Sequence, residues 1–236
     1  MDNTKKIAFV LYPGLTPLDI VGPLQVMNTL QIFVPHWESV VVGERMEAME
    51  TDAGVLMTPE ATFEEVPDPA IIVVPGGIAP TIRQMGNPVL REYLLAVSER
   101  AEVVASVCTG SMILAAAGLL EGRKATTHWG FASLLERLGA TYVPERWVED
   151  GDILTAAGVS AGIDMALQLV SRITDEGTAR FVQLGVEYDP QPPFGGIDWA
   201  SVDREMFAER FRADVREQLA DSPDLRDRLL GVEGAG

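Results

Sequence analysis

The middle of the chain reads Val103-Val-Ala-Ser-Val-Cys-Thr-Gly-Ser-Met-Ile-Leu-Ala-Ala-Ala117. Five β-prone residues lead directly into Cys108, the small residues Thr109-Gly-Ser111 follow, and an alanine-rich helical segment then begins. A strand that turns into a helix at one residue presents that side chain at the carboxyl edge of a sheet. This arrangement is a nucleophile elbow with sulfur in place of oxygen. The stretch therefore predicts an α/β fold in which Cys108 is the nucleophile.

The chemistry of Cys108 has two readings from the sequence. Unpaired cysteines are most often small buried hydrophobic residues, and such a cysteine is inert. The free N–H groups and partial positive charge at a helix start instead favour the thiolate over the thiol. Because Cys108 is expected at a strand-to-helix corner among Gly and Ser residues, we predict a reactive thiolate.

Composition narrows the class of protein. The 236 residues suit one large α/β domain with a sizeable core, and 47% of them are hydrophobic. A net charge of −17 argues against a nucleic-acid partner. No apolar run approaches the roughly 20 residues that a membrane span needs. A single cysteine forms no internal disulfide, which suits the reducing cytoplasm, where we expect the protein.

Alternating strand and helix patterns extend over most of the chain. Strands are expected at 7–12, 39–42, 70–74, 103–107 and 153–156, and helices at 20–30, 88–100, 160–173 and 178–184. This alternation predicts a doubly wound, mostly parallel sheet with helices on both faces. We expect one domain over residues 1–195. Residues 196–236 are expected to form a helical extension, packed on the core or on a second subunit.

Asp19 lies a few residues past the first predicted strand, in Leu15-Thr-Pro-Leu-Asp-Ile-Val-Gly-Pro23. A helix N-cap would explain an aspartate at this position. A carboxyl group beside the sulfur, able to give or take a proton, would explain it equally well. The two roles are compatible, and the sequence leaves both open.

Two further segments should reach the same edge of the sheet, where ligands bind in doubly wound folds. Gly76 and Gly77 follow a buried strand, so they form either a plain tight turn or a nest of N–H groups that stabilises an anion. Thr109 is either merely tolerated or supplies a hydroxyl that holds water. Ile78, Trp129 and Val159 are apolar candidates for a pocket wall.

His128 is a candidate general base, although packing or capping is the more common role for a histidine at a strand end. We expect it to line the pocket, together with Gly158. With His36 it is one of only two histidines, and with the one cysteine they form no spaced metal-ligand set. No metal is expected.

The motifs Pro75-Gly-Gly77 and Ser106-Val-Cys-Thr-Gly110, with the early Asp19, resemble the DJ-1/PfpI superfamily of flavodoxin-like proteins. Within it, Leu18-Asp-Ile-Val-Gly-Pro23 and Ala125-Thr-Thr-His-Trp129 are similar to the isonitrile hydratase (isocyanide hydratase) branch. The likeness covers about residues 6 to 195.

This resemblance implies a small-molecule isonitrile substrate, which is hydrated to a formamide without a cofactor. It assigns attack on the isonitrile carbon to Cys108, giving a thioimidate, and acid–base roles to Asp19 with help from Thr109. Gly76, Gly77, Ile78, His128, Trp129, Gly158 and Val159 would surround the substrate. The resemblance also implies a homodimer.

Two alternatives remain within the same fold. One is a glyoxalase-type cysteine enzyme acting on methylglyoxal, although the members of that branch carry Glu where this chain has Asp19. The other is a non-enzymatic, redox-responsive protein, because an accessible thiolate is readily oxidised. Protease-like members carry His directly after the nucleophile, and Thr109 stands there instead.

Overall fold

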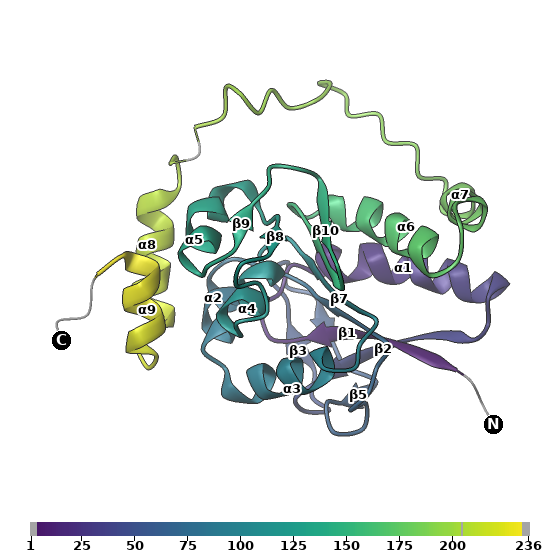
Figure 1. Ribbon diagram of the computed structural model, residues 1–236, viewed down its shortest axis with the longest axis horizontal. Helices are drawn as coiled ribbons and strands as arrows, with labels where there is room; N and C mark the ends of the chain where they lie inside the picture. The colour runs from purple at the N-terminus through teal and green to yellow at the C-terminus, as the bar shows by residue number, and fades with distance from the viewer. Residues whose placement is uncertain (1–3, 204, 233–236) are drawn as a thin grey trace.

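The computed structural model describes residues 4–203 and 205–232, and its centre is a seven-stranded sheet (Figure 1). The strand order is β10-β11-β7-β6-β1-β2-β5. The strands are β1 (Lys5–Leu11), β2 (Trp37–Gly43), β5 (Ala61–Thr62), β6 (Ile71–Val74), β7 (Val103–Val107), β10 (Trp147–Asp150) and β11 (Ile153–Ala156). All neighbours pair in parallel except β10 and β11, which form an antiparallel hairpin. The predicted doubly wound, mostly parallel sheet is confirmed.

Helices cover both faces of this sheet (Figure 1). One face carries α1 (Pro17–Phe33), α6 (Ala161–Ile173) and α7 (Glu176–Gly185), which contact one another. The other carries α2 (Ala79–Met85), α3 (Pro88–Ser98), α4 (Gly110–Ala116) and α5 (Ala132–Arg137). Two covered faces explain why the central strands are apolar throughout rather than alternating.

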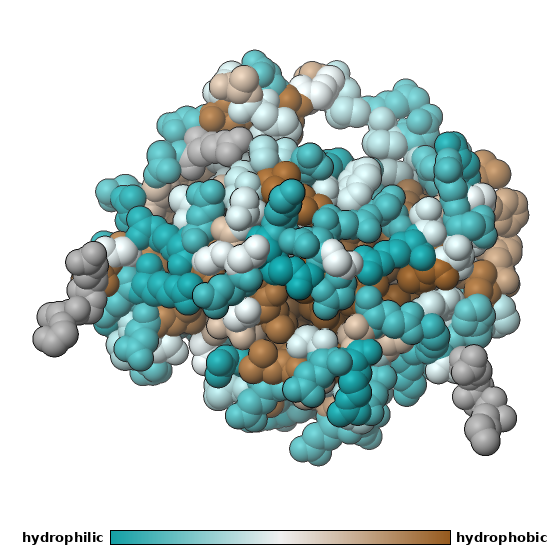
Figure 2. Space-filling view, viewed as in Figure 1, coloured by the Kyte–Doolittle hydropathy of each residue, from teal (hydrophilic) through white to brown (hydrophobic). Residues whose placement is uncertain are grey.

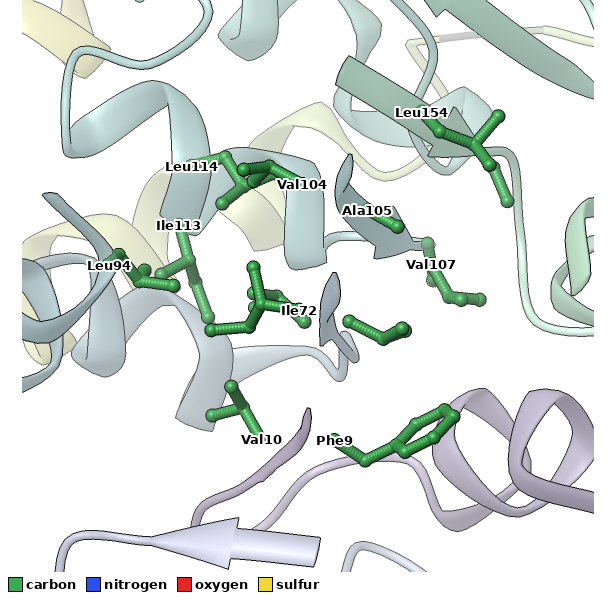
Figure 3. Close-up of a cluster of buried hydrophobic side chains, with 14 of the residues drawn as sticks. Phe9, Val10, Ile72, Leu94, Val104, Ala105, Val107, Ile113, Leu114 and Leu154 are labelled. Carbon is green, nitrogen blue, oxygen red and sulfur yellow. The ribbon is translucent and has the colours of Figure 1, made fainter. Parts of the chain in front are cut away.

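The core is built from side chains that alternate between the two faces of each strand. Figure 3 shows Val10, Ile72 and Val104 directed toward α3 and α4, whereas Phe9 points the other way, toward α1. These side chains are at most 1% exposed. Because β6 and β7 are both central, the loops after them are held rigidly at the carboxyl edge of the sheet.

Several short elements lie outside the sheet. The strands β3 (Met49–Glu50) and β4 (Leu56–Met57) form a short antiparallel hairpin. The strands β8 (Lys124–Ala125) and β9 (Thr141–Tyr142) pair in parallel. A 3-10 helix, η1 (Trp129–Phe131), leads into α5.

The C-terminal part of the chain returns to the core over a long exposed segment. Residues 189–201 are all exposed, and in Figure 2 they arch over the body with open space beneath them. The chain then forms α8 (Ala208–Gln218) and α9 (Pro223–Leu230), and α8 packs against α2. Both helices of the extension predicted for 196–236 thus contact the core. Positions 204 and 233–236 lie outside the described residues.

Candidate active site

Cys108 occupies the corner between β7 and α4. Its φ angle is +57°, a left-handed conformation that costs a non-glycine residue on the order of 1–3 kcal/mol. Hydrogen bonds hold this conformation from both sides. The Cys108 N–H donates to the carbonyls of Ala156 and Ala157, at 3.1 and 2.9 Å, and its carbonyl accepts from the hydroxyls of Ser111 and Thr127. The elbow expected from the sequence is therefore present.

Two glycines allow the loop after β6 to lie directly on the elbow. A Cβ atom on Gly110 would lie 2.0 Å from the Val74 carbonyl oxygen, and one on Gly76 would lie 2.5 Å from the Thr109 nitrogen. Real Cβ atoms do not approach backbone atoms this closely. The glycines are thus required by close contact between the β6 and β7 loops.

Asp19 lies beneath the sulfur. Because α1 begins at Pro17, Asp19 lies in the first turn of that helix, and the predicted N-cap role is wrong; Thr16 occupies the cap position. The carboxyl group is fully buried, and its Oδ2 accepts a 2.9 Å hydrogen bond from the Gly76 N–H. Oδ1 has no hydrogen-bond partner among the described residues, although the Cys108 thiol lies near enough to this carboxyl group to lower its pKa.

Burial raises the pKa of Asp19 to about 7. The hydrogen bonds from Gly76 and Cys108 stabilise the charged form and oppose this shift, but they are the smaller effects. Asp19 is therefore close to half protonated at neutral pH. A carboxyl group in this condition accepts or donates a proton with little cost, as a general acid–base requires.

Burial also raises the pKa of the Cys108 thiol, to about 12, and the negative charge of Asp19 acts in the same direction. Hydrogen bonds from the Val159 and Thr109 N–H groups lower it, as does the nearby Thr109 side chain, without reversing the shift. Burial and the Asp19 charge thus oppose the resting thiolate that the sequence predicts. The helix α4 has only seven residues, and its favourable dipole is outweighed by loss of solvent and by the neighbouring carboxyl group.

Thr109 links the elbow to the loop after β6. Its hydroxyl donates to the Gly77 carbonyl and accepts from the Gly77 N–H at 2.9 Å. The N–H groups of Gly76 and Gly77 thus already have acceptors, so the anion nest considered for them is not available. The N–H groups that face the sulfur belong to Thr109 and Val159 instead. Val159 has a φ of +23°, at the margin of the left-handed region.

A cavity of about 380 Å³ opens in front of the sulfur. Of the predicted residues it is lined by Gly77, Ile78, Cys108, Thr109, His128, Trp129 and Val159. Gly76 lies behind the elbow, and Gly158 lines a neighbouring hollow of about 370 Å³. Sequence reasoning did not identify Thr16, Phe131, Phe207, Arg210 and Phe211, which complete the wall.

His128 lines the cavity as a neutral ring. Its Nδ1 accepts a 3.3 Å hydrogen bond from the Gly130 N–H, and in this way it caps η1. Burial lowers the pKa of the imidazole. No hydrogen bond joins it to Cys108 among the described residues, so the structure supports the lining role over that of general base.

The described part of the chain has no cluster of three or more His, Cys, Asp or Glu side chains that could hold a metal ion. Nor does any helix within it have the length and apolar character needed to cross a membrane.

A buried cysteine on a strand-to-helix corner, paired with a carboxyl group under a doubly wound sheet, defines a class of α/β cysteine proteins. The family model of the DJ-1/PfpI family matches residues 5–172, and the chain belongs to that family. The isonitrile hydratase of Pseudomonas putida is 39% identical over 232 residues, covering 94% of this chain and 99% of the relative.

Solved structures agree with this assignment. A ThiJ/PfpI family protein from Pseudomonas syringae superposes with a TM-score of 0.82 at 33% identity, covering 97% of this chain and 91% of that one. Drosophila melanogaster DJ-1β superposes with a TM-score of 0.71 over 79% of this chain and 100% of that one. At 21% identity, the second similarity shows the shared fold alone.

Proposed function

We propose that the protein is an isonitrile hydratase, which converts R–N≡C and water into the formamide R–NH–CHO without a cofactor. One observation carries the proposal: the Cys108 sulfur, which lines a largely apolar cavity, lies next to the buried Asp19 carboxyl group. Similarity to the Pseudomonas putida enzyme over nearly the whole of both chains supports it.

The two pKa values set the proton count of this pair. Burial raises both pKa values, that of the thiol further, so when the pair shares a single proton that proton rests on sulfur. Asp19 is then a carboxylate in contact with a thiol. A weak nucleophile next to a base is the usual arrangement for nucleophilic catalysis.

In the first step, Cys108 adds to the terminal carbon of the isonitrile. As the S–C bond forms, the thiol proton passes to Asp19, which delivers it to the same carbon. The product is a thioimidate, Cys108–S–CH=N–R, in which carbon has gained one bond to sulfur and one to hydrogen. The Thr109 and Val159 N–H groups stabilise the negative charge that appears on sulfur during the transfer.

In the second step, water adds to the thioimidate carbon. Asp19 takes one proton from the water and delivers it to the imine nitrogen, giving Cys108–S–CH(OH)–NH–R and leaving Asp19 as the carboxylate. Cleavage of the C–S bond releases R–NH–CHO, and the hydroxyl proton returns to sulfur through Asp19. The Thr109 hydroxyl, which lies against the sulfur, is placed to hold the water. The cycle consumes one isonitrile and one water.

The character of the cavity weighs against methylglyoxal as the substrate. Methylglyoxal is small and strongly hydrated, whereas four aromatic side chains surround this cavity: Trp129, Phe131, Phe207 and Phe211. A neutral, buried thiol is also a poor fit to a redox sensor, because oxidation acts on an accessible thiolate. Both alternatives remain as outcomes of the experiment below.

We expect the enzyme to act as a homodimer. Four apolar residues of α1 and α7 lie at the surface: Ile32, Phe33, Phe181 and Leu184. Ile32 is 74% and Leu184 72% exposed, and the rings of Phe33 and Phe181 contact each other edge to face. Sedimentation should give a dimer at micromolar concentration, and Leu184→Asp should shift it toward monomer. The same change at exposed Leu56 is the control.

The test of function is formation of N-(4-nitrophenyl)formamide from para-nitrophenyl isocyanide, followed by absorbance and confirmed by mass. The reduced, unmodified protein should turn over, and Cys108→Ala should not, while its thermal midpoint stays close to that of the unmodified protein. Absence of turnover by folded, reduced protein would discard the proposal. Methylglyoxal is the next substrate to examine in that case.

A further inference from the structure

The outer wall of the catalytic cavity comes from the far end of the chain. Phe207 and Phe211 of the C-terminal segment line the cavity opposite Cys108, together with Trp129 and Phe131. Ring centroids are 5.7 Å apart for Trp129 and Phe207, and 4.1 Å apart for Phe131 and Phe211. We call these four residues the aromatic wall. They form one continuous surface, because the ring centroids of Phe207 and Phe211 also lie 6.0 Å apart.

The helix α8 is firmly docked, so this wall is a fixed part of the cavity. Phe211 and Val215 are buried, and Arg83 Nε donates to Gln218 Oε1 at 2.9 Å, joining α8 to α2. Gly130 lets Phe211 approach the backbone, since a Cβ atom there would lie 2.9 Å from the ring. Phe207 is 42% exposed and forms the accessible rim of the wall.

The cavity holds no free charge that would favour an ionic substrate. Arg210 is the one cation among the described lining residues, and its guanidinium lies 3.5 Å from the carboxylate of Asp214 on the same helix. Burial keeps His128 neutral. A ligand in this cavity therefore exchanges water mainly for aromatic surface.

The shape of the functional group relates the wall to the sulfur. The atoms C≡N–R of an isonitrile are collinear, so a carbon at Cys108 directs R straight out of the cavity floor. Its R group is then surrounded by the cavity lining, which includes all four residues of the aromatic wall.

We propose that the aromatic wall is the subsite for the R group and that Phe207 is a specificity-determining residue, so the substrates are isonitriles with an aryl or bulky apolar R group. This inference rests on the proposed hydratase function. The C-terminal segment then selects the substrate, while Cys108 after β7 and Asp19 in the first turn of α1 carry out the chemistry.

The kinetic test compares Phe207→Ala with the unmodified protein on para-nitrophenyl, cyclohexyl and methyl isocyanide. The variant should raise KM about tenfold for para-nitrophenyl and cyclohexyl isocyanide, because it loses roughly one aromatic contact with the R group. Its kcat should stay within about twofold. For methyl isocyanide neither constant should change. Phe194→Ala is the matched control, because Phe194 is 98% exposed and lies outside the cavity lining. Equal effects on all three substrates, or none, would overturn the assignment.

A second measurement separates the subsite from the hydratase chemistry. Cys108 is the only cysteine of the chain, so disulfide formation with benzyl and methyl methanethiosulfonate reports on this cavity alone. The benzyl-to-methyl rate ratio, normalised to glutathione, should exceed one in the unmodified protein and fall about tenfold in Phe207→Ala. A ratio that Phe207→Ala leaves unchanged would refute the subsite. If no isocyanide is hydrated but the ratio falls, the subsite stands and only the proposed function fails.

The folding of the variants can be checked independently. Phe207→Ala alters a half-exposed side chain, and its circular dichroism and thermal midpoint should match those of Phe194→Ala. Phe211→Leu, which retains volume at a buried position, should give a smaller change of KM in the same direction. A rise in KM for methyl isocyanide in both variants would indicate general damage and count against the assignment.

Discussion

The backbone N–H of Gly76 donates to Asp19 Oδ2 over 2.9 Å, although the two residues are 57 positions apart in the chain. This bond joins the loop after β6 to the first turn of α1 and determines the orientation of the carboxyl group. It occupies Oδ2, while Oδ1 has no hydrogen-bond partner among the described residues. A residue that contacts no substrate thereby sets the geometry of proton transfer.

The pH dependence of turnover should follow Asp19. Its carboxylate form accepts the thiol proton, and its pKa is about 7. We therefore expect kcat/KM to fall about tenfold per pH unit below pH 7 and to stay level up to about pH 9. Asp19→Glu should keep this acid limb at a reduced rate, and Asp19→Asn should lose turnover. A rate that is constant from pH 5 to 8 would contradict the assignment of Asp19 as the base.

Asp19→Asn should also stabilise the protein at neutral pH. The pKa of Asp19 is raised from 3.8 to about 7, so the folded state binds the proton more tightly, and the resulting stability is lost as pH rises through this window. Asn does not titrate. The free energy of unfolding of the variant relative to the unmodified protein should therefore grow between pH 4 and pH 7, by at most about 4 kcal/mol.

Urea denaturation at pH 4.5 and pH 8 measures this difference. Asp221→Asn, an exposed position, is the control and should show no dependence on pH. If the difference in unfolding free energy between Asp19→Asn and the unmodified protein were the same at pH 4.5 and pH 8, burial of the Asp19 charge would cost nothing.

Gly110→Ala should disrupt the elbow. Its methyl group would lie 2.0 Å from the Val74 carbonyl oxygen, so β6 and α4 must move apart. We expect a loss of about 3 kcal/mol in stability and a large loss of turnover. Gly196→Ala, with no atom within 4 Å of its added methyl, should leave the thermal midpoint unchanged. An active Gly110→Ala protein of normal thermal midpoint would show that this close contact is not needed.

His128→Asn tests the alternative base. Asn is a good cap and accepts the Gly130 N–H in place of Nδ1. Because His128 is neutral and Asp19 holds the titrating proton, kcat/KM of this variant should still fall below about pH 7, with a moderate change in KM. Disappearance of the limb in this variant would transfer the base role to His128.

The sequence predicts the backbone structure around Cys108 well, because the residues that determine it are close together in the chain. An apolar run followed at once by small residues forces the elbow at Cys108, and the glycines after β6 indicate a close approach. Asp19 could be placed near the sulfur because parallel strands end at the same edge. Its exact position in the first turn of α1 was missed, since Pro17 begins the helix three residues earlier than expected.

Properties that depend on packing could not be predicted. The direction of the Cys108 pKa shift follows from burial and from the buried Asp19, and neither can be read from the stretch around the thiol. The segment with Phe207 and Phe211 is rich in charged residues and reads as a surface helix. Its place in the cavity depends on contacts with α2 and with Phe131, which lie more than 70 positions earlier.

The exposed segment at 189–201 separates two functions that many enzymes combine in one region of the chain. Cys108 and Asp19, to which we assign the bond-making steps, lie before it, and half of the aromatic wall lies after it. Substitutions in α8 can therefore accumulate without disturbing the elbow. Substrate preference can therefore diverge among related proteins through substitutions near the C-terminus, while the residues that carry out the reaction stay the same.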